Sequence, residues 1–188
     1  MSADGWLRLR VPLGFIFAAW YLWLTRYARQ EMLVVSTLMV VLGCGLRSWA
    51  AGYLLKGKRV AVGGPYAYIR NPLYLGSFLI GSGFCLALYQ SPLPAAVLMS
   101  WFLYAMGFVL LYATKSRSEE EELVRTLGRE YQAYRRRVPV FLPVHGKVAG
   151  LGVQRFSAEL YRRNREYQCV MGSLAVLALL YWRTLYGS

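Results

Sequence analysis

Residues 32–55 read MLVVSTLMVVLGCGLRSWAAGYLL, an apolar run long enough to cross a bilayer as one helix. A spanning helix needs ~20 mostly apolar residues to cross ~30 Å of hydrocarbon. The rest of the chain agrees with this assignment, because 57% of its 188 residues are hydrophobic and its formal net charge is +13. Such a composition is typical of a small multispanning membrane protein and excludes an ordinary soluble domain.

Further apolar segments lie on both sides of this run. We therefore expect an all-α membrane protein, a single domain over residues 1–188, with about five transmembrane helices. The expected spans are 11–27, 32–55, 73–89, 93–114 and 169–186. The last span is marginal, and its Arg183 must extend a long side chain to the headgroups.

The basic residues set the expected orientation. All but four of the 22 Lys and Arg residues fall on the side that carries the amino terminus, the loop 56–72 and the segment 115–167. Because cytoplasmic loops hold the excess of positive charge, we expect a multi-pass membrane protein with these segments in the cytoplasm. The basic face should contact anionic membrane lipids. Nucleic-acid binding is not expected, since it would need a solvent-facing domain.

The chain lacks the residues of several common site types. Its three cysteines, Cys44, Cys85 and Cys169, all lie in apolar segments, so we expect no disulfide framework and no zinc site. Its single histidine, His145, cannot by itself form a metal site or a Ser-His-Asp relay. We therefore predict no metal.

The loop 56–72 carries more polar and aromatic chemistry than a turn between two helices requires. It leads into the span 73–89, and the span 93–114 leads into the acidic segment 115–143. Only residues 90–92 separate these two spans, so they form a hairpin, and the start of the first lies beside the end of the second. Irregular backbone at membrane depth is tolerated where it lines a cavity or is buried in protein. We predict a pocket at this cytoplasmic end.

The segment after residue 115 predicts an amphipathic helix from about 117 to 137 at the cytoplasmic face. Apolar residues recur there at intervals of three and four, which places them on one stripe. They are Leu123, Leu127, Tyr131, Tyr134 and Val138. At ~100° per residue, Glu120 lies within the stripe and Glu119 at its edge, whereas Glu121 and Glu122 point away. A carboxylate that faces protein or lipid needs a partner. The candidates are Lys58, Arg59, Arg70 and a bound cation.

Arg47 lies in the middle of the span 32–55. A basic residue at such a position costs ~2.5 kcal/mol or more on insertion scales, and it indicates a functional side chain that faces the bundle interior. The alternative is that the side chain extends past Leu55 to the cytoplasmic headgroups.

Two motifs together resemble the isoprenylcysteine carboxyl methyltransferase and phospholipid methyltransferase superfamily of integral-membrane enzymes. They are GPYAYIRNPLYLG at 64–76 and EEEELVRTLGREYQAYRRRVPVFLP at 119–143. The resemblance extends from about residue 46 to residue 143, and the sequence NREY at 164–167 is similar to that of small bacterial members. It implies an enzyme of the bacterial plasma membrane that holds S-adenosylmethionine in a cofactor pocket at the cytoplasmic face. The methyl group passes to a lipidic or small amphiphilic acceptor that arrives from the bilayer, with S-adenosylhomocysteine as product.

The resemblance also implies roles for individual residues. Cofactor contacts are expected at Lys58, Arg59, Val60, Ala61, Tyr66, Asn71, Pro72, Leu73, Tyr74 and Glu119. The expected catalytic set is Arg70, Glu119 and Glu120. The resemblance places a substrate-side basic residue at Lys115. Arg47 is a second expected substrate-side residue, because of its charge within a span and not because of the resemblance. The prenylcysteine enzymes carry His where this chain has Asn71, and Arg where it has Lys115. Because Asn cannot take up a proton and Lys lacks the bidentate fork that suits a carboxylate, both changes weigh against a prenylcysteine acceptor.

Two other functions fit parts of the sequence. A membrane reductase of the sterol-reductase type would use the basic cluster Lys56, Lys58 and Arg59 for the 2′-phosphate of NADPH, although the chain is too short for the extra helices of those enzymes. A non-catalytic lipid-binding or assembly protein would use the motif as a rigid loop and the glutamates as a docking face. The methyl acceptor and the oligomeric state are left open.

Overall fold

The computed structural model describes residues 16, 18–28, 30–55, 59–88, 94–142 and 154–186. All regular secondary structure in this part of the chain is helical, which confirms the predicted all-α class for it. The elements are η1 Thr25–Tyr27, η2 Gln30–Met32, α2 Leu33–Ala51, η3 Gly64–Ala67, α3 Pro72–Leu86, α4 Pro94–Arg137, α5 Ala158–Asn164 and α6 Tyr167–Tyr186.

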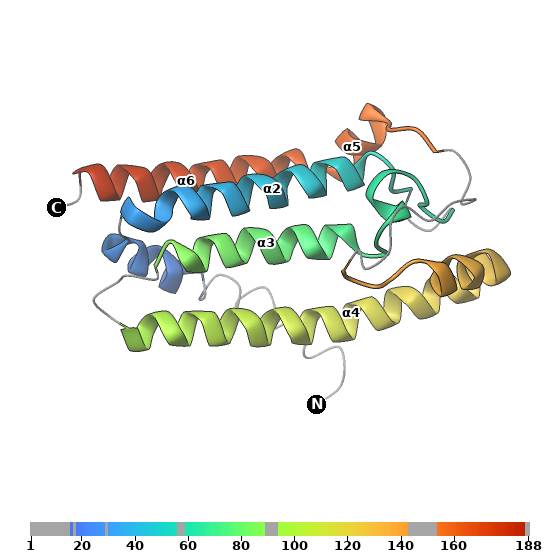
Figure 1. Ribbon diagram of the computed structural model, residues 1–188, viewed down its shortest axis with the longest axis horizontal. Coiled ribbons are helices and arrows are strands. Elements are labelled where there is room, and N and C mark those ends of the chain that lie inside the picture. The colour runs from blue at the N-terminus through green and yellow to red at the C-terminus, as the bar shows by residue number, and fades with distance from the viewer. Residues whose placement is uncertain are drawn as a thin grey trace.

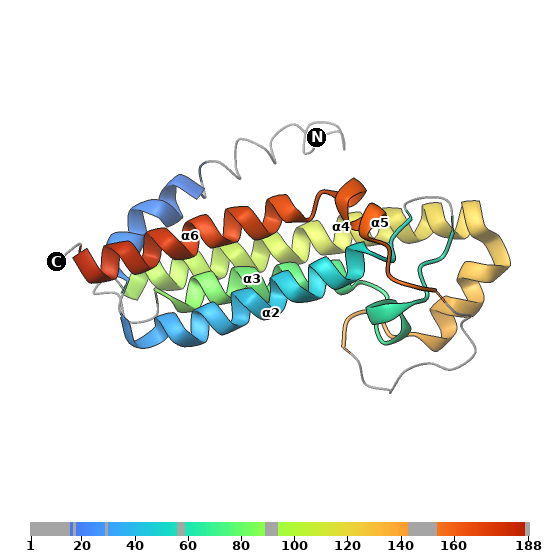
Figure 2. The same ribbon diagram turned by 90° about the horizontal axis from the view of Figure 1, so that it is seen from above.

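Helices α2, α3, α4 and α6 run alongside one another in an elongated bundle (Figures 1 and 2). α2 packs on both α3 and α6, and α3 also packs on α4. The short helices η3 and α5 gather at one end of the bundle, where the last part of α4 also lies (Figure 1). The polar loop before α3 and the charged part of α4 therefore share one end, as the predicted hairpin requires.

Two described helices are long and apolar enough to cross a membrane. They are Gln30–Ala51, with mean hydropathy 1.7, and Tyr167–Tyr186, with mean hydropathy 1.4. Pro72–Leu86 and Pro94–Leu110 are apolar but shorter. A helix of 15 residues such as α3 rises only ~22 Å, which is less than the ~30 Å hydrocarbon thickness. The predicted span 11–27 lies partly outside the described residues. By length and composition, the described residues contain two candidate spans, where we predicted five spans for the whole chain.

Helix α4 differs from the prediction at two points. We expected a span over 93–114 followed by a separate helix, but α4 continues through this junction. A change from apolar to charged side chains does not interrupt backbone hydrogen bonds, and no Gly or Pro occurs there. The interruption comes at Gly128, with φ 52° and ψ −125°, where the end of α4 turns back toward the bundle (Figure 2). Glycine adopts this backbone region without the steric cost that a Cβ would add.

The contact between α2 and α3 is close at Gly43 and Gly76. A Cβ on Gly43 would lie 2.6 Å from the Gly76 carbonyl oxygen, and a Cβ on Gly76 would lie 2.5 Å from Cγ of Arg47. Small residues allow such an approach between helices in a membrane. This packing lays the aliphatic part of the Arg47 side chain against the first turns of α3.

Candidate functional site

The motif loop, residues 59–71, is hydrogen-bonded to the end of α4 and the residues that follow it. The Tyr134 hydroxyl donates to the Tyr66 carbonyl oxygen at 2.8 Å. The Arg70 amide donates to the Pro139 carbonyl oxygen, also at 2.8 Å. These bonds satisfy backbone groups of an irregular segment that no helix or sheet pairs. The reversal at Gly128 is what brings the two segments together.

Apolar packing reinforces the same contact. The buried cluster consists of Val60, Tyr131, Tyr134 and Val138, with Val62, Leu123, Val124 and Leu127 packed against it. All five residues of the predicted stripe belong to it, so the stripe is confirmed as a packing face. Its partner is the motif loop.

Arg70 and Glu120 form an ion pair between the motif loop and α4. Arg70 Nη1 lies 2.5 Å from Glu120 Oε1, and the two side chains are only 9% and 16% exposed. Arg70 was one of the predicted partners of Glu120, and this pairing is confirmed. Arg135 Nε also lies 3.4 Å from Glu120 Oε2, a contact that a straight helix could not make. Arg70 Nε is buried and has no hydrogen-bond acceptor among the described residues.

The first turn of α3 meets the adjoining turns of α4 through neutral donors. Asn71, the residue before α3, donates from Nδ2 to Ser116 Oγ at 3.4 Å and to the Tyr112 hydroxyl at 3.5 Å. The Tyr74 hydroxyl donates to Glu119 Oε2 at 3.3 Å. The Tyr74 and Tyr112 rings pack edge to face, with centroids 5.4 Å apart. Predicted cofactor residues of both motifs thus lie side by side.

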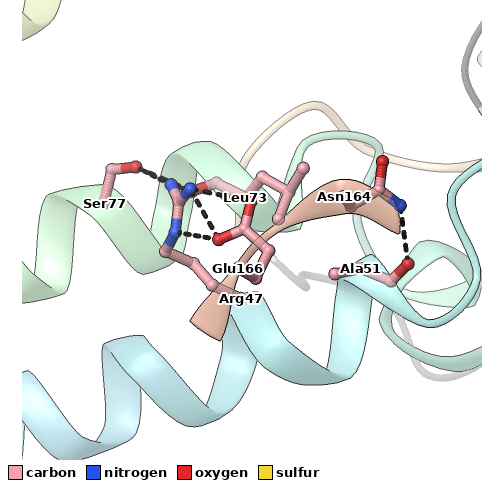
Figure 3. Close-up of polar contacts among 6 residues, drawn as sticks. All are labelled: Arg47, Ala51, Leu73, Ser77, Asn164 and Glu166. Carbon is pink, nitrogen blue, oxygen red and sulfur yellow. Dashed lines mark hydrogen bonds and ion pairs between the residues drawn. The ribbon is translucent and has the colours of Figure 1, made fainter. Parts of the chain in front are cut away.

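Arg47 faces the bundle interior, where it binds Glu166 (Figure 3). Its Nε donates to Oε2 at 2.9 Å and its Nη2 donates to Oε1 at 3.0 Å. Nη1 donates to the Leu73 carbonyl oxygen at 3.2 Å and to Ser77 Oγ. Sequence reasoning did not select Glu166, although a charge within a span needs a partner. The acid directly before the last apolar segment was the available signal.

Tyr66 is buried within electrostatic reach of both groups of charges. Burial raises the pKa of its phenol, the negative charges of Glu166 and Glu119 raise this pKa further, and the positive charge of Arg47 lowers it. The Tyr66 phenol therefore stays protonated at neutral pH and is available as a hydrogen-bond donor.

The remaining predicted residues have varied surroundings. Ala61 and Pro72 are buried, whereas Arg59 is exposed. Outside the described part lie Lys56, Lys58, His145 and the side chain of Lys115. Over the ranges that the structure describes, no group of three His, Cys, Asp or Glu side chains could hold a metal ion.

Comparisons with curated proteins find three relatives of this chain. It is 33% identical over 125 residues to the nickel-cobalt-cadmium resistance protein NccN of Alcaligenes xylosoxydans xylosoxydans, a match to 64% of this chain and 54% of the relative. It is 30% identical over 82 residues to the methanethiol S-methyltransferase of Crocosphaera subtropica, covering 44% and 28%. It is 28% identical over 145 residues to the protein-S-isoprenylcysteine O-methyltransferase of Schizosaccharomyces pombe, covering 72% and 56%.

The chain therefore spans about half the length of two of these relatives and less than a third of the other. No family model and no solved structure matches it. Two of the three relatives are named as methyltransferases, one acting on sulfur and one on oxygen. These similarities confirm the resemblance of the two motifs to the isoprenylcysteine carboxyl methyltransferase-like superfamily.

Proposed function

We propose that this protein is an integral-membrane methyltransferase with about five helices in the bilayer. It transfers a methyl group from S-adenosylmethionine to a lipidic or amphiphilic acceptor at the cytoplasmic face of a bacterial plasma membrane. The observation that carries the proposal is the meeting of the two motifs through the pairs Arg70–Glu120 and Tyr74–Glu119. The names of two relatives support the reaction class.

The side chains present suit the groups of S-adenosylmethionine. Its ribose hydroxyls and amino group call for a carboxylate, its own carboxylate for a cation, and its adenine for an aromatic or apolar slot. Glu119 is an exposed carboxylate at the edge of the cluster, and Arg70 Nε is a buried donor that meets no acceptor in the part of the chain that the structure describes. We assign Glu119 to a hydroxyl or amino group, Arg70 and residues 58–61 to the carboxylate, and Tyr66 and Tyr74 to the pocket wall.

The chain contributes position, charge and exclusion of water. When bound, S-adenosylmethionine supplies an electrophilic methyl group on a sulfonium cation. Arg70 and Arg135 both lie against Glu120 and offset its charge, so we assign to Glu119, the exposed carboxylate beside Tyr74, the attraction of a cationic ligand. Most of the acceleration then comes from holding acceptor and donor in line in a site with little water. Asn71 cannot act as a base, because its side-chain amide does not take up a proton. If the acceptor must lose a proton, we assign the role of base to Glu119 or Glu120.

The acceptor is expected to reach the site from the bilayer. Exposed apolar side chains cover the outer faces of the bundle, among them Leu42, Leu98, Phe102 and Val109. An amphiphile dissolved in the membrane can therefore approach the end where the motifs meet with its apolar part still in lipid. Lys115, one turn before Glu119, is the residue assigned to its polar group.

The test uses the full chain purified in detergent. Calorimetry with S-adenosylhomocysteine is expected to give a saturable isotherm, and Glu119→Gln is expected to weaken binding about tenfold through loss of a charge-assisted hydrogen bond. The matched control is Glu122→Gln, an exposed carboxylate in the same acidic run that should leave the affinity unchanged. Mass spectrometry of labelled methyl transfer into a total lipid extract would then identify the acceptor.

Two results would replace the proposal. Quenching of tyrosine and tryptophan emission by NADPH, with no response to the methyl donor, would favour a membrane reductase. If the protein binds neither NADPH nor S-adenosylhomocysteine, a non-catalytic membrane protein would be favoured.

A further inference from the structure

Arg47 is almost fully occupied by protein groups. A guanidinium has five N–H donors, and four hydrogen bonds from Arg47 reach Glu166, Leu73 and Ser77. We infer that Arg47 and Glu166 are a positioning pair that fixes the first turn of α3 for binding of the methyl donor. This role differs from the acceptor contact that the sequence predicted for Arg47, and it rests on the proposed function.

The first turn of α3 is the element that the pair holds. Ser77 Oγ donates to the Leu73 carbonyl oxygen at 3.0 Å, and Arg47 Nη1 donates to the same carbonyl at 3.2 Å. Leu73 lies between Asn71 and Tyr74, whose side chains meet α4. Of these two donors only Arg47 lies outside α3, so its hydrogen bond is the one that fixes the rotation of the turn about the helix axis. The neighbouring side chains then point at α4 in one orientation.

The pair is anchored from the α6 side by residues directly before that helix. Asn164 Nδ2 donates to the carbonyl oxygens of Ala51 and Leu54, both at 2.9 Å. These acceptors lie at the end of α2, just before the motif loop. Glu166 is two residues further along the chain and reaches Arg47 one turn earlier on α2 (Figure 3). The segment before α6 therefore contacts the end of α2 twice, through Asn164 and through Glu166.

The chemistry of the pair indicates orientation more than stability. A buried ion pair can be replaced by apolar residues with little loss of stability, because desolvation offsets the attraction. A bidentate guanidinium–carboxylate contact nevertheless fixes direction, which a lysine or an apolar side chain does not. The charges of this pair also reach the buried Tyr66 phenol in the motif loop. The pair thus lies beside the first turn of α3. Both carboxylate oxygens of Glu166 are bound by Arg47, and the guanidinium of Arg47 is bound by Glu166, Leu73 and Ser77, so we do not assign either side chain to the acceptor.

The decisive experiment compares cofactor binding and thermal stability in the full chain. The double variant Arg47→Met with Glu166→Gln removes both charges together, so that no buried charge is left unpaired. We expect it to bind S-adenosylhomocysteine about tenfold more weakly by calorimetry, as expected for a displaced binding group. The control is Arg183→Met, which removes an arginine that also joins two segments, through Leu22 and Thr25, at the opposite end of the bundle. This control should lower Tm without changing the affinity.

Each outcome decides between the two proposals. If the wild-type protein does not bind S-adenosylhomocysteine, both the proposed function and the positioning role are wrong. If the wild type binds and the double variant binds within about twofold of it, only the positioning role is wrong. Should the double variant fail to fold, Arg47→Lys carries the test, because it keeps the charge but loses the fork. A folded Arg47→Lys with wild-type affinity would likewise overturn the inference.

Discussion

Arg70 and Glu120, 50 positions apart in the sequence, are joined by a hydrogen bond of 2.5 Å from Nη1 to Oε1. Arg70 lies two residues before the start of α3, and Glu120 follows the apolar part of α4. The pair closes the end of the hairpin at which both motifs lie. Arg135 joins it from the part of α4 beyond Gly128, so one carboxylate connects three segments.

Loss of this carboxylate should destabilise the fold. Glu120→Gln leaves Arg70 mostly buried beside a neutral amide, and breaking one side of such a pair costs about 2 kcal/mol at this partial exposure. The expected fall in Tm is about 5 °C for a chain of this size. Thermal unfolding in detergent measures it. Glu121→Gln, at an exposed neighbour, should shift Tm by less than about 1 °C, and equal shifts for the two variants would contradict the structural role of Glu120.

A second prediction separates binding from folding at Tyr74. Tyr74→Phe removes the hydroxyl that donates to Glu119 and keeps the ring that packs on Tyr112. Loss of this orienting bond should weaken S-adenosylhomocysteine binding about fivefold, the equivalent of one hydrogen bond, with little change in Tm. Tyr104→Phe is the matched control, because its hydroxyl donates to the Phe78 carbonyl oxygen away from the glutamates. The same loss of affinity in both variants would show that Tyr74 has no special role.

The part of the site that periodicity describes could be predicted from the sequence. Helical spacing placed Glu120 among the apolar residues of its stripe, and a carboxylate in such surroundings needs a cation. Because the hairpin brings the two segments together, Arg70 was one of the candidate partners, alongside Lys58, Arg59 and a bound cation. The same spacing identified Tyr131, Tyr134 and Val138 as buried, and the structure confirms this.

Other features depend on tertiary contacts that spacing does not encode. The Arg47–Glu166 pair spans 119 positions, and many acids could have satisfied Arg47 on charge alone. The reversal at Gly128 was missed because residues on both sides of it pack on one cluster, so that the apolar pattern continues across the break. Helix α3 ends at Leu86, before the end of the predicted span 73–89, although the apolar composition continues through Ala87 and Leu88.

The reversal at Gly128 leads to a third prediction. With φ 52° and ψ −125°, a side chain at this position is strained even though no atom lies within 4 Å of the Cβ that Ala would add. Gly128→Ala should therefore cost about 1–3 kcal/mol. Gly107→Ala is the control, since Gly107 is helical and its added Cβ also meets nothing within 4 Å. It should be neutral or stabilising by up to about 1 kcal/mol.

Thermal unfolding distinguishes the two glycine variants directly. A lower Tm for Gly128→Ala alone would support the reversal, and the loss should extend to S-adenosylhomocysteine affinity because Tyr134 and Pro139 hold the motif loop. If Gly128→Ala matches Gly107→Ala in both measurements, α4 continues as an ordinary helix at this point.

A final prediction concerns the close contact that carries Arg47. At Gly76 an added Cβ would lie 2.5 Å from Arg47 Cγ and 2.8 Å from the Gly43 carbonyl oxygen. Because backbone cannot move aside as a flexible side chain can, Gly76→Ala should separate α2 from α3 and cost about 1–3 kcal/mol. Gly45→Ala, where the same atom meets nothing within 4 Å, should be tolerated. Comparing Tm and S-adenosylhomocysteine affinity of the two variants tests this, since displacement of Arg47 should weaken binding only in Gly76→Ala. If Gly76→Ala leaves the stability unchanged, α2 and α3 do not approach as closely at Gly43 and Gly76 as these distances indicate.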